Sequence, residues 1–195
     1  MPDYRALRQD IRARRRSIPP AEARHRAAQL AHAVRRDRLT LTCRHIAAYL
    51  AADGELDPHP LIESLWSLGK RVYLPVLVPF TRNRLWFARY TPASRLVHNR
   101  YGIPEPDRAE LVRPAALDLV LTPLVAFDDS GHRIGMGGGF YDRTFAFLQA
   151  RSHWRKPLLL GIAYAFQQQP HITAAPWDVP LDAVATETGV RHFRP

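Results

Sequence analysis

The first 38 residues alternate apolar and polar positions with the period of a helix. Leu7 and Ile11 form a narrow apolar stripe, and Ser17 is followed by Pro19 and Pro20, which favours the end of one helix and the start of another. The second helix is predicted from about Pro20 to about Arg36. We expect it to bury one face, formed by Ala27, Leu30, Ala31 and Val34.

After this helical segment the pattern changes to short apolar runs separated by turns. Residues 45–50, 71–76, 157–163 and 181–185 are predicted strands, and 84–90 an added strand. Residues 117–127 are almost unbroken apolar, as expected of a central parallel strand. Helices are predicted over residues 58–68, where Gly69 follows as the C-terminal glycine, and over 140–150. In residues 101–106, Pro104 and Pro106 flank Glu105 and exclude regular helix.

A series of strands alternating with helices is typical of an α/β layer with a parallel sheet. No internal repeat, low-complexity segment or long linker divides the chain, so we expect one domain over residues 1–195. The predicted fold is a single-domain, three-layer α/β structure with a mainly parallel sheet and a helical N-terminal arm.

Composition narrows the class of protein. The chain has 195 residues, with 28 Lys and Arg against 18 Asp and Glu, a formal net charge of +10. The single cysteine, Cys43, excludes an internal disulfide framework and is expected to be a buried small residue. No apolar run approaches the ~20 residues of a membrane span, and the N-terminus lacks the apolar segment of a secretory signal. We expect a cytoplasmic protein.

The positive charge is nearly all arginine, since Lys70 and Lys156 are the only lysines. Guanidinium groups suit phosphate, carboxylate or nucleic-acid partners, and an arginine-rich surface exposed to solvent is the simpler interpretation. Charge alone does not distinguish a nucleic-acid-binding protein from an enzyme acting on anionic small molecules.

The most informative segment is residues 133–143, which holds four of the ten glycines within five residues and lies between a predicted strand and a predicted helix. Backbone N–H groups of such a loop can approach a phosphate closely, and Arg133 and Arg143 flank it. The segment lacks the Gly-Lys-Ser/Thr of a Walker A loop, and Phe140 stands where a dinucleotide fingerprint requires glycine. A simple flexible turn is the competing interpretation.

An acidic residue follows the glycines directly. A carboxylate beside a phosphate cradle, here Asp142, is what a Mg²⁺ ion bridging phosphate oxygens requires. Its acidic partner is either Asp178 or Asp182, on a stretch stiffened by Pro176 and Pro180. Each of these two carboxylates could instead be a turn or capping residue.

The segment 133–142, Arg-Ile-Gly-Met-Gly-Gly-Gly-Phe-Tyr-Asp, resembles the signature of the 5-formyltetrahydrofolate cyclo-ligase family, also called 5,10-methenyltetrahydrofolate synthetases. The run from Tyr101 to Pro106, the Asp178-x-x-x-Asp182 tail, the early strand ending in Leu50 and the arginine-rich first helix follow in the family's order. The resemblance covers essentially the whole chain. It implies ATP-dependent cyclisation of 5-formyltetrahydrofolate to 5,10-methenyltetrahydrofolate, with release of ADP and phosphate. Separately, we expect a monomer with no nucleic-acid or membrane partner.

The resemblance also implies roles for residues. Mg²⁺ is expected on Asp142 and Asp178. Arg133, Tyr141 and Asp142 are the catalytic candidates. Leu50 and Glu55 match positions that contact the folate. The expected ATP contacts are Tyr4, Arg5, Arg8, Arg133, Ile134, Gly135, Met136, Gly137, Gly138, Gly139, Phe140 and Tyr141, and the glycine stretch from Met136 to Phe140 is also expected to face the folate. Tyr4 stands where the family often has Lys, so Arg5 is a candidate to replace that lysine.

Two other functions remain open at this point. The arginine-rich arm favours a nucleic-acid-binding protein, although it lacks the interleaved aromatic residues of single-strand binding. A sugar-phosphate isomerase on a related α/β fold would bind phosphate without needing ATP. Dependence on ATP distinguishes the three.

Overall fold

A computed structural model describes residues 3–77, 84–99, 102–107, 110–150 and 156–193. Its helices are α1 (Arg5–Arg16), α2 (Pro20–Arg35), α3 (Arg38–Thr42), α4 (His59–Ser67) and α5 (Phe140–Phe145), with 3-10 turns at Pro114–Ala116, Ala146–Leu148 and Ala165–Gln167. The strands are β1 (His45–Ala47), β2 (Arg71–Leu77), β3 (Leu85–Tyr90), β4 (Leu96–His98), β5 (Pro104–Pro106), β6 (Leu111–Val112), β7 (Leu119–Pro123), β8 (Ala126–Phe127), β9 (Arg133–Ile134), β10 (Leu158–Ile162), β11 (Ala183–Thr186) and β12 (Gly189–His192).

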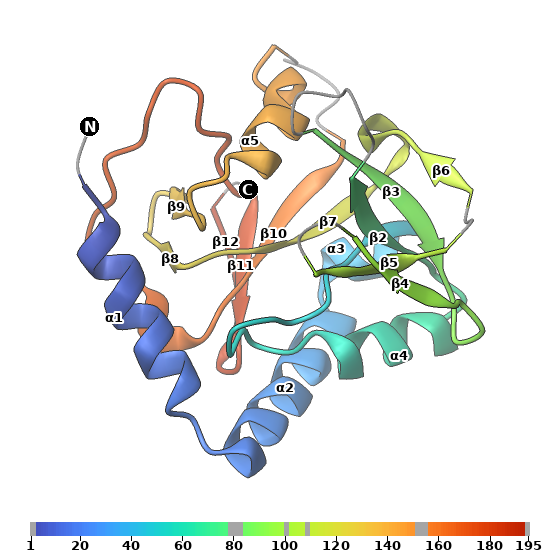
Figure 1. The fold of residues 1–195 in the computed structure, drawn as a ribbon, viewed down its shortest axis with the longest axis horizontal. Helices are drawn as coiled ribbons and strands as arrows, with labels where there is room; N and C mark the ends of the chain where they lie inside the picture. The colour runs from blue at the N-terminus through green and yellow to red at the C-terminus, as the bar shows by residue number, and fades with distance from the viewer. Residues whose placement is uncertain (1–2, 78–83, 100–101, 108–109, 151–155, 194–195) are drawn as a thin grey trace.

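The main sheet has eight strands in the order β12-β11-β10-β7-β1-β2-β3-β6 (Figure 1). The pairs that join β11, β10, β7, β1 and β2 are parallel, and β12, β3 and β6 pair antiparallel at the two edges. This confirms the predicted mainly parallel α/β sheet. Two small antiparallel pairs, β4–β5 and β8–β9, lie outside it.

Successive residues of the central strands enter two different cores, as the two-residue period of a strand requires. In β7, Leu119 and Leu121 pack with α2 and α4 on one face of the sheet, while Val120 packs with Phe145 of α5 on the other. Figure 1 shows the same layers, with α2 and α4 below the sheet and α5 above it. The predicted buried face of α2, Ala27, Leu30, Ala31 and Val34, is confirmed.

The N-terminal helix α1 is part of the packed structure and not a free arm. Ile11 is fully buried against Val125, Ala126, Ile134 and Ile172, so the helix packs on the β8–β9 hairpin. This third cluster also explains why the predicted strand 117–127 was too long. Its apolar run is continuous because its last residues are buried under α1, but the chain leaves the main sheet after Pro123, and β8 pairs with β9.

Other boundaries differ as well. The helix predicted over 140–150 becomes a 3-10 turn after Phe145, and the last predicted strand starts at Ala183. The edge strand β12, half exposed, was missed because its side chains carry no continuous apolar signal. Of the segment 101–106, Tyr101 lies outside the described residues, while Pro104–Pro106 is extended in β5 as its prolines require. None of the helices in the described ranges is long and apolar enough to cross a bilayer.

Packing of α1 on the β8–β9 hairpin predicts a large stability effect at Ile11. Ile11→Ala should lower the free energy of unfolding by about 2–4 kcal/mol, because it removes a fully buried side chain from a small cluster. Denaturant unfolding followed by circular dichroism measures this. Leu41→Ala is the matched control, since Leu41 is 60% exposed and should change stability by less than about 0.5 kcal/mol. Equal effects in the two variants would contradict the packing.

Candidate functional site

The strand order reverses at β1, and an open α/β sheet is expected to have a crevice outside the carboxyl ends of its strands at such a point. The chain passes from β1 to β2 on one side, and β7 then returns to pair on the other side of β1. In open α/β sheets, ligands bind outside the carboxyl ends of strands where the strand order reverses in this way. Here β1 leads into the loop with Leu50 and Glu55, while β7 leads through the β8–β9 hairpin to the glycine-rich loop. Two of the segments predicted to bind ligands therefore leave neighbouring strands at this point.

The glycine-rich loop, residues 135–139, exposes its backbone. Gly137 has φ +96° and Gly139 has φ +60°, backbone conformations that residues other than glycine rarely adopt. Within the described part of the chain, none of the five N–H groups donates a hydrogen bond. A row of exposed N–H donors is a cradle for an anion. Helix α5, which follows, has six residues, so the loop itself supplies most of this capacity.

Two arginines place positive charge on this loop from different directions. Nε of Arg8 in α1 donates to the carbonyl oxygen of Gly135 at 2.8 Å. The guanidinium carbon of Arg8 is also 3.9 Å from the position that a Cβ on Gly137 would occupy. Arg143 donates to the carbonyl oxygen of Gly138 and lies over the ring of Phe140. The structure thus places Arg8 beside the loop, while its role as an ATP contact stays a prediction.

The other two N-terminal candidates lie differently. The hydroxyl oxygen of Tyr4 accepts a hydrogen bond from the backbone N–H of Thr173 at 2.9 Å, so Tyr4 ties the start of α1 to the loop that precedes Asp178. Arg5 is exposed, and its backbone N–H donates to Asp3. No hydrogen bond joins Tyr4 or Arg5 to the glycine-rich loop among the residues that the structure describes.

The acidic residues predicted to hold a metal are organised by Arg133. The Arg133 side chain is 5% exposed; it donates to Oδ1 of Asp142 at 2.5 Å and to the carbonyl oxygen of Val179. The N–H of Val179 donates in turn to the same Asp142 oxygen at 3.3 Å. Asp142 therefore lies against the segment that carries Asp178, whose Oδ2 accepts from the N–H of Ala175 at 2.8 Å.

The alternative acidic partner, Asp182, lies elsewhere. Its Oδ2 accepts from the N–H of Leu159 at 2.8 Å and so fixes the start of β10 beside the segment leading to β11. Asp178 is thus the residue whose segment lies beside Asp142.

The carboxylate oxygens of Asp142 and Asp178 fit Mg²⁺ better than a metal ion whose ligands all come from the protein. Within the described ranges no group of three or more His, Cys, Asp or Glu side chains could hold a metal ion. Oδ2 of Asp142 and Oδ1 of Asp178 accept no hydrogen bond from any described residue. Mg²⁺ typically takes one or two carboxylates together with substrate phosphates and water, and two carboxylates beside an anion cradle match that donor set.

On the opposite side of the crevice, Glu55 lies in a tight turn after β1. Its Oε2 accepts from the N–H of Ala52 at 3.1 Å. Burial raises the pKa of Glu55, and its negative charge contributes to the raised pKa values of Tyr49 and Tyr141, whose largest cause is burial. Leu50 is half-buried against the core under α2 and α4. Glu55 and Tyr141, from segments far apart in the sequence, therefore lie near each other.

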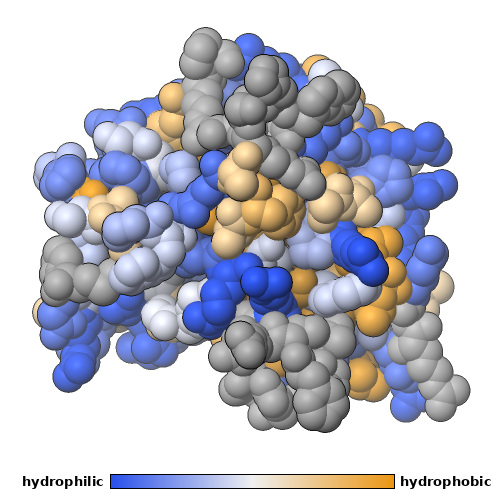
Figure 2. Space-filling model, turned by 90° about the horizontal axis from the view of Figure 1, so that it is seen from above, coloured by the Kyte–Doolittle hydropathy of each residue, from blue (hydrophilic) through white to orange (hydrophobic). Residues whose placement is uncertain are grey.

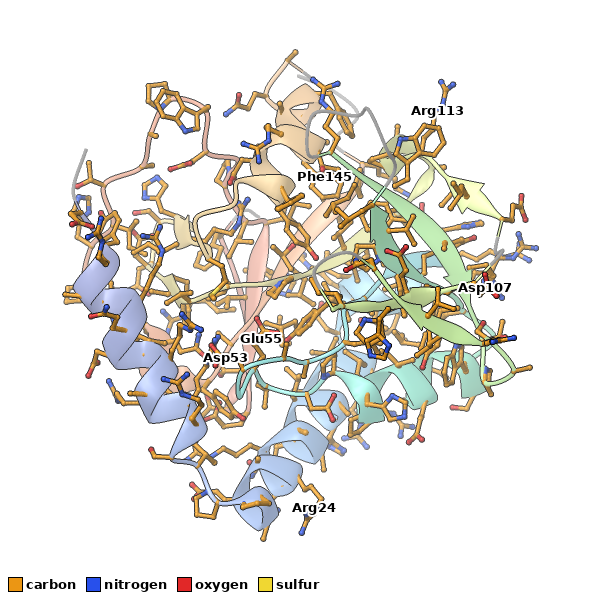
Figure 3. The ribbon with its side chains drawn as sticks, in the orientation of Figure 1. Arg24, Asp53, Glu55, Asp107, Arg113 and Phe145 are labelled. Atoms are coloured by element: carbon orange, nitrogen blue, oxygen red, sulfur yellow. The ribbon has the colours of Figure 1, made fainter. Side chains whose placement is uncertain are left out.

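The residue that holds this turn was not predicted. Asp53 has φ +51°, and its carboxylate forms ion pairs with Arg12, with Arg15 at 3.5 Å and with Arg16 at 3.1 Å. Burial alone would raise the pKa of Asp53, but these three guanidinium groups together lower it. Figure 3 shows Asp53 and Glu55 on the same loop, between α1 and the sheet. Asp53 was not a candidate from the sequence, because ion pairs over this separation leave no local pattern.

Most arginines of α1 contact other parts of the protein, although only Arg15 is buried. Arg12, Arg15 and Arg16 surround Asp53, Arg8 reaches the glycine-rich loop, and Arg14 lies 4.4 Å from the ring centre of Phe166. The sequence pattern gave no sign of these contacts, although Arg14 and Arg16 remain more than half exposed. Figure 2, seen from the side on which α5 lies, shows apolar residues near the centre of the face among hydrophilic ones.

Comparison with known proteins agrees with this architecture. Residues 1–187 match the model of the 5-formyltetrahydrofolate cyclo-ligase family. The chain is 44% identical over 182 residues to the 5-formyltetrahydrofolate cyclo-ligase of Escherichia coli K12, covering 92% of this chain and 98% of the relative. The corresponding Haemophilus influenzae protein is 47% identical over 140 residues, covering 71% and 73%.

Solved structures show the same fold. The Aquifex aeolicus 5,10-methenyltetrahydrofolate synthetase superposes with a TM-score of 0.82 at 30% identity, covering 97% of this chain and 92% of that one. The 5,10-methenyltetrahydrofolate synthetase of Mycoplasma pneumoniae, at 24% identity, superposes with a TM-score of 0.72 over 95% of this chain and 99% of that one.

The contact between Arg8 and the glycine-rich loop predicts a local loss of anion binding. Arg8→Met should weaken binding of inorganic triphosphate about five- to tenfold, because a charged donor beside the cradle is lost. Isothermal titration calorimetry measures the affinity. Arg5→Met removes an equal charge three residues earlier on the same helix and should change the affinity less than twofold. Equal losses would mean that only the net charge matters.

Proposed function

The chain belongs to the 5-formyltetrahydrofolate cyclo-ligase family, and from this premise we propose how its own residues carry out the reaction. The enzyme converts 5-formyltetrahydrofolate and ATP to 5,10-methenyltetrahydrofolate, ADP and phosphate. One observation carries the proposal: an exposed row of N–H donors with Arg8 beside it lies at the switch point where the loop of Glu55 also begins.

The chemistry has two stages. The formyl oxygen attacks the γ-phosphorus of ATP, the bond to the bridging oxygen breaks, and ADP leaves. N10 of the folate then attacks the activated carbon and phosphate departs with the former formyl oxygen, closing the ring and leaving the methenyl cation once the N10 proton is lost. Phosphoryl transfer of this kind needs alignment and neutralisation of charge more than covalent help from the protein.

ATP is held by the glycine-rich loop. The N–H groups of residues 135–139 donate to its phosphates, and Arg8, already fixed on the Gly135 carbonyl, adds positive charge. Gly137 and Gly139 keep the loop in a conformation that turns its backbone outward. Tyr4 supports this side indirectly, because its hydroxyl anchors α1 to Thr173, and Arg5 lies on the exposed side of the helix.

Arg133 acts through Asp142. Its buried guanidinium is already committed to Asp142 and to the Val179 carbonyl, so it orients the carboxylate and the Asp178 segment. Asp142 and Asp178 would hold Mg²⁺, which when bound neutralises charge on the ATP phosphates. Burial raises the pKa of Tyr141, so its hydroxyl stays protonated at neutral pH and can donate a hydrogen bond toward the reacting groups.

The folate lies on the Glu55 side of the crevice. A carboxylate accepts hydrogen bonds from paired N–H donors such as those at the edge of a pterin. Glu55 is half-buried, its Oε2 is held by the N–H of Ala52, and its carboxylate can accept hydrogen bonds from the pterin N–H groups. Leu50 offers apolar surface from the same loop, and Phe140 and the half-exposed Met136 offer it from the glycine-rich side. The formyl group would then lie between the two loops.

We further propose that the enzyme acts as a monomer in the cytoplasm, without nucleic-acid or membrane partners. The ion pairs of Arg12, Arg15 and Arg16 with Asp53 and the contact of Arg8 with Gly135 support this, since these arginines already have partners within the protein. Cys43 is a free, buried cysteine, and burial raises the pKa of its thiol. A single unpaired cysteine fits a reducing compartment.

The reaction is tested directly by absorbance. Purified protein mixed with 5-formyltetrahydrofolate, ATP and Mg²⁺ should develop the long-wavelength absorbance of the methenyl product, and omission of ATP should abolish it. An absorbance change equal to that of a no-enzyme control would contradict the assignment. Turnover without ATP would favour an isomerase-type reaction.

The Mg²⁺ proposal predicts a specific loss at Asp142. Asp142→Asn should lower kcat at least a hundredfold at low Mg²⁺ and raise the Mg²⁺ concentration needed for half-maximal rate, because one carboxylate ligand is gone. Folding is checked by circular dichroism. Asp129→Asn, an exposed carboxylate paired with Arg191, is the control and should leave the Mg²⁺ dependence unchanged. A normal Mg²⁺ dependence in Asp142→Asn would remove this residue from the metal site.

A further inference from the structure

Arg15 is the most deeply buried arginine of α1. Its side chain is 1% exposed, yet the hydrogen-bond donors of its guanidinium are poorly used. Nη1 donates a long hydrogen bond of 3.4 Å to the carbonyl oxygen of Leu124, and Nη2 lies 3.5 Å from Oδ2 of Asp53. Neither Nε nor Nη2 makes a hydrogen bond with any of the described residues. A buried, under-partnered charge is costly, and in a native structure it calls for a function.

The position of Arg15 joins the two loops of the crevice. Leu124 follows β7 directly, and its carbonyl oxygen also accepts from Gln167 at 3.0 Å. Asp53 belongs to the turn after β1. Arg15 therefore contacts the segments that follow both β7 and β1, the two strands at the switch point proposed to bind the ligands.

The backbone of Arg15 also supports the turn directly. A Cβ on Gly54 would lie 3.0 Å from the carbonyl carbon of Arg15, so the helix and the turn are in contact with no room for a side chain. The left-handed conformation of Asp53 is held in place by the ion pairs. Glu55 is two residues further along this turn.

We propose that Arg15 is a positioning residue for Glu55: its backbone packs against Gly54 and its guanidinium pairs with Asp53, so it fixes the turn that presents the Glu55 carboxylate to the folate and brings a buried positive charge to that turn. The inference rests on the proposed role of Glu55 in the cyclisation. Burial raises the pKa of Glu55, whereas the hydrogen bond from Ala52 and, after it, the positive charge of Arg15 lower it. Among the described residues, the groups that face Glu55 are Asp53 and the N–H of Ala52 on its own turn, Arg15 from α1, Tyr49 after β1, and Tyr141 from α5. Of these, only Arg15 is a cation.

Arg15→Met should therefore raise the KM for 5-formyltetrahydrofolate up to about tenfold at acidic pH, and less at neutral pH, while leaving the KM for ATP nearly unchanged. The rise in folate KM on acidification should begin about one pH unit higher than in the wild type, because the Glu55 carboxyl then protonates more easily. Steady-state kinetics from pH 5 to 9 measures both. Arg15→Lys keeps the charge and should retain the wild-type pH dependence.

The control is Arg16→Met. Arg16 is the next residue and pairs with the same Asp53 carboxylate, but its side chain is 57% exposed. It should leave both KM values and the pH profile unchanged. If Arg15→Met does not fold, Arg15→Gln, which keeps a donor for the Leu124 carbonyl but no charge, carries the same test.

A double-variant cycle separates this inference from the proposed function. If Arg15 acts through Glu55, Arg15→Met should add little to the folate KM of Glu55→Gln. Additive effects, a uniform rise in KM at every pH, or a shift in Arg15→Lys as large as in Arg15→Met would overturn the inference. An unchanged folate KM in Glu55→Gln would instead overturn the proposed role of Glu55.

Discussion

The carboxylate of Asp53 connects the parts of the molecule on which the site depends. It lies in a turn after β1 and forms ion pairs with three arginines of α1, one of them almost fully buried. The same helix packs through Ile11 on the β8–β9 hairpin and, through Arg8, contacts the glycine-rich loop. One helix thereby sets the distance between the loop proposed to hold ATP and the turn proposed to hold the folate.

The sheet supplies the framework for this arrangement. Because β7 returns beside β1, the loops that leave these two strands meet at one edge, and alternating side chains of β7 fill the cores above and below. Arg133 then ties Asp142 to the segment of Asp178, the two carboxylates proposed to hold a metal. The apolar and acidic groups on the Glu55 side complete the crevice.

The elements with strong periodicity were predictable from the sequence: the buried face of α2, the central strands and the mainly parallel sheet. The glycine-rich loop was predictable because closely spaced glycines are a local signal. The end of β7 was not, since burial against α1 and burial within a sheet leave the same apolar pattern. The roles of Asp53 and Arg15 were not predictable either, because their ion pair joins residues 38 positions apart in separate elements.

The central claim is that α1, held by Asp53, supports both halves of the crevice at once. Calorimetric titration of Asp53→Asn with a non-hydrolysable ATP analogue and, separately, with 5-formyltetrahydrofolate tests it most directly. The account predicts that both affinities fall, although Asp53 belongs to neither proposed contact set. If Asp53→Asn is folded and only the folate affinity falls, the two loops are positioned independently and the claim is contradicted.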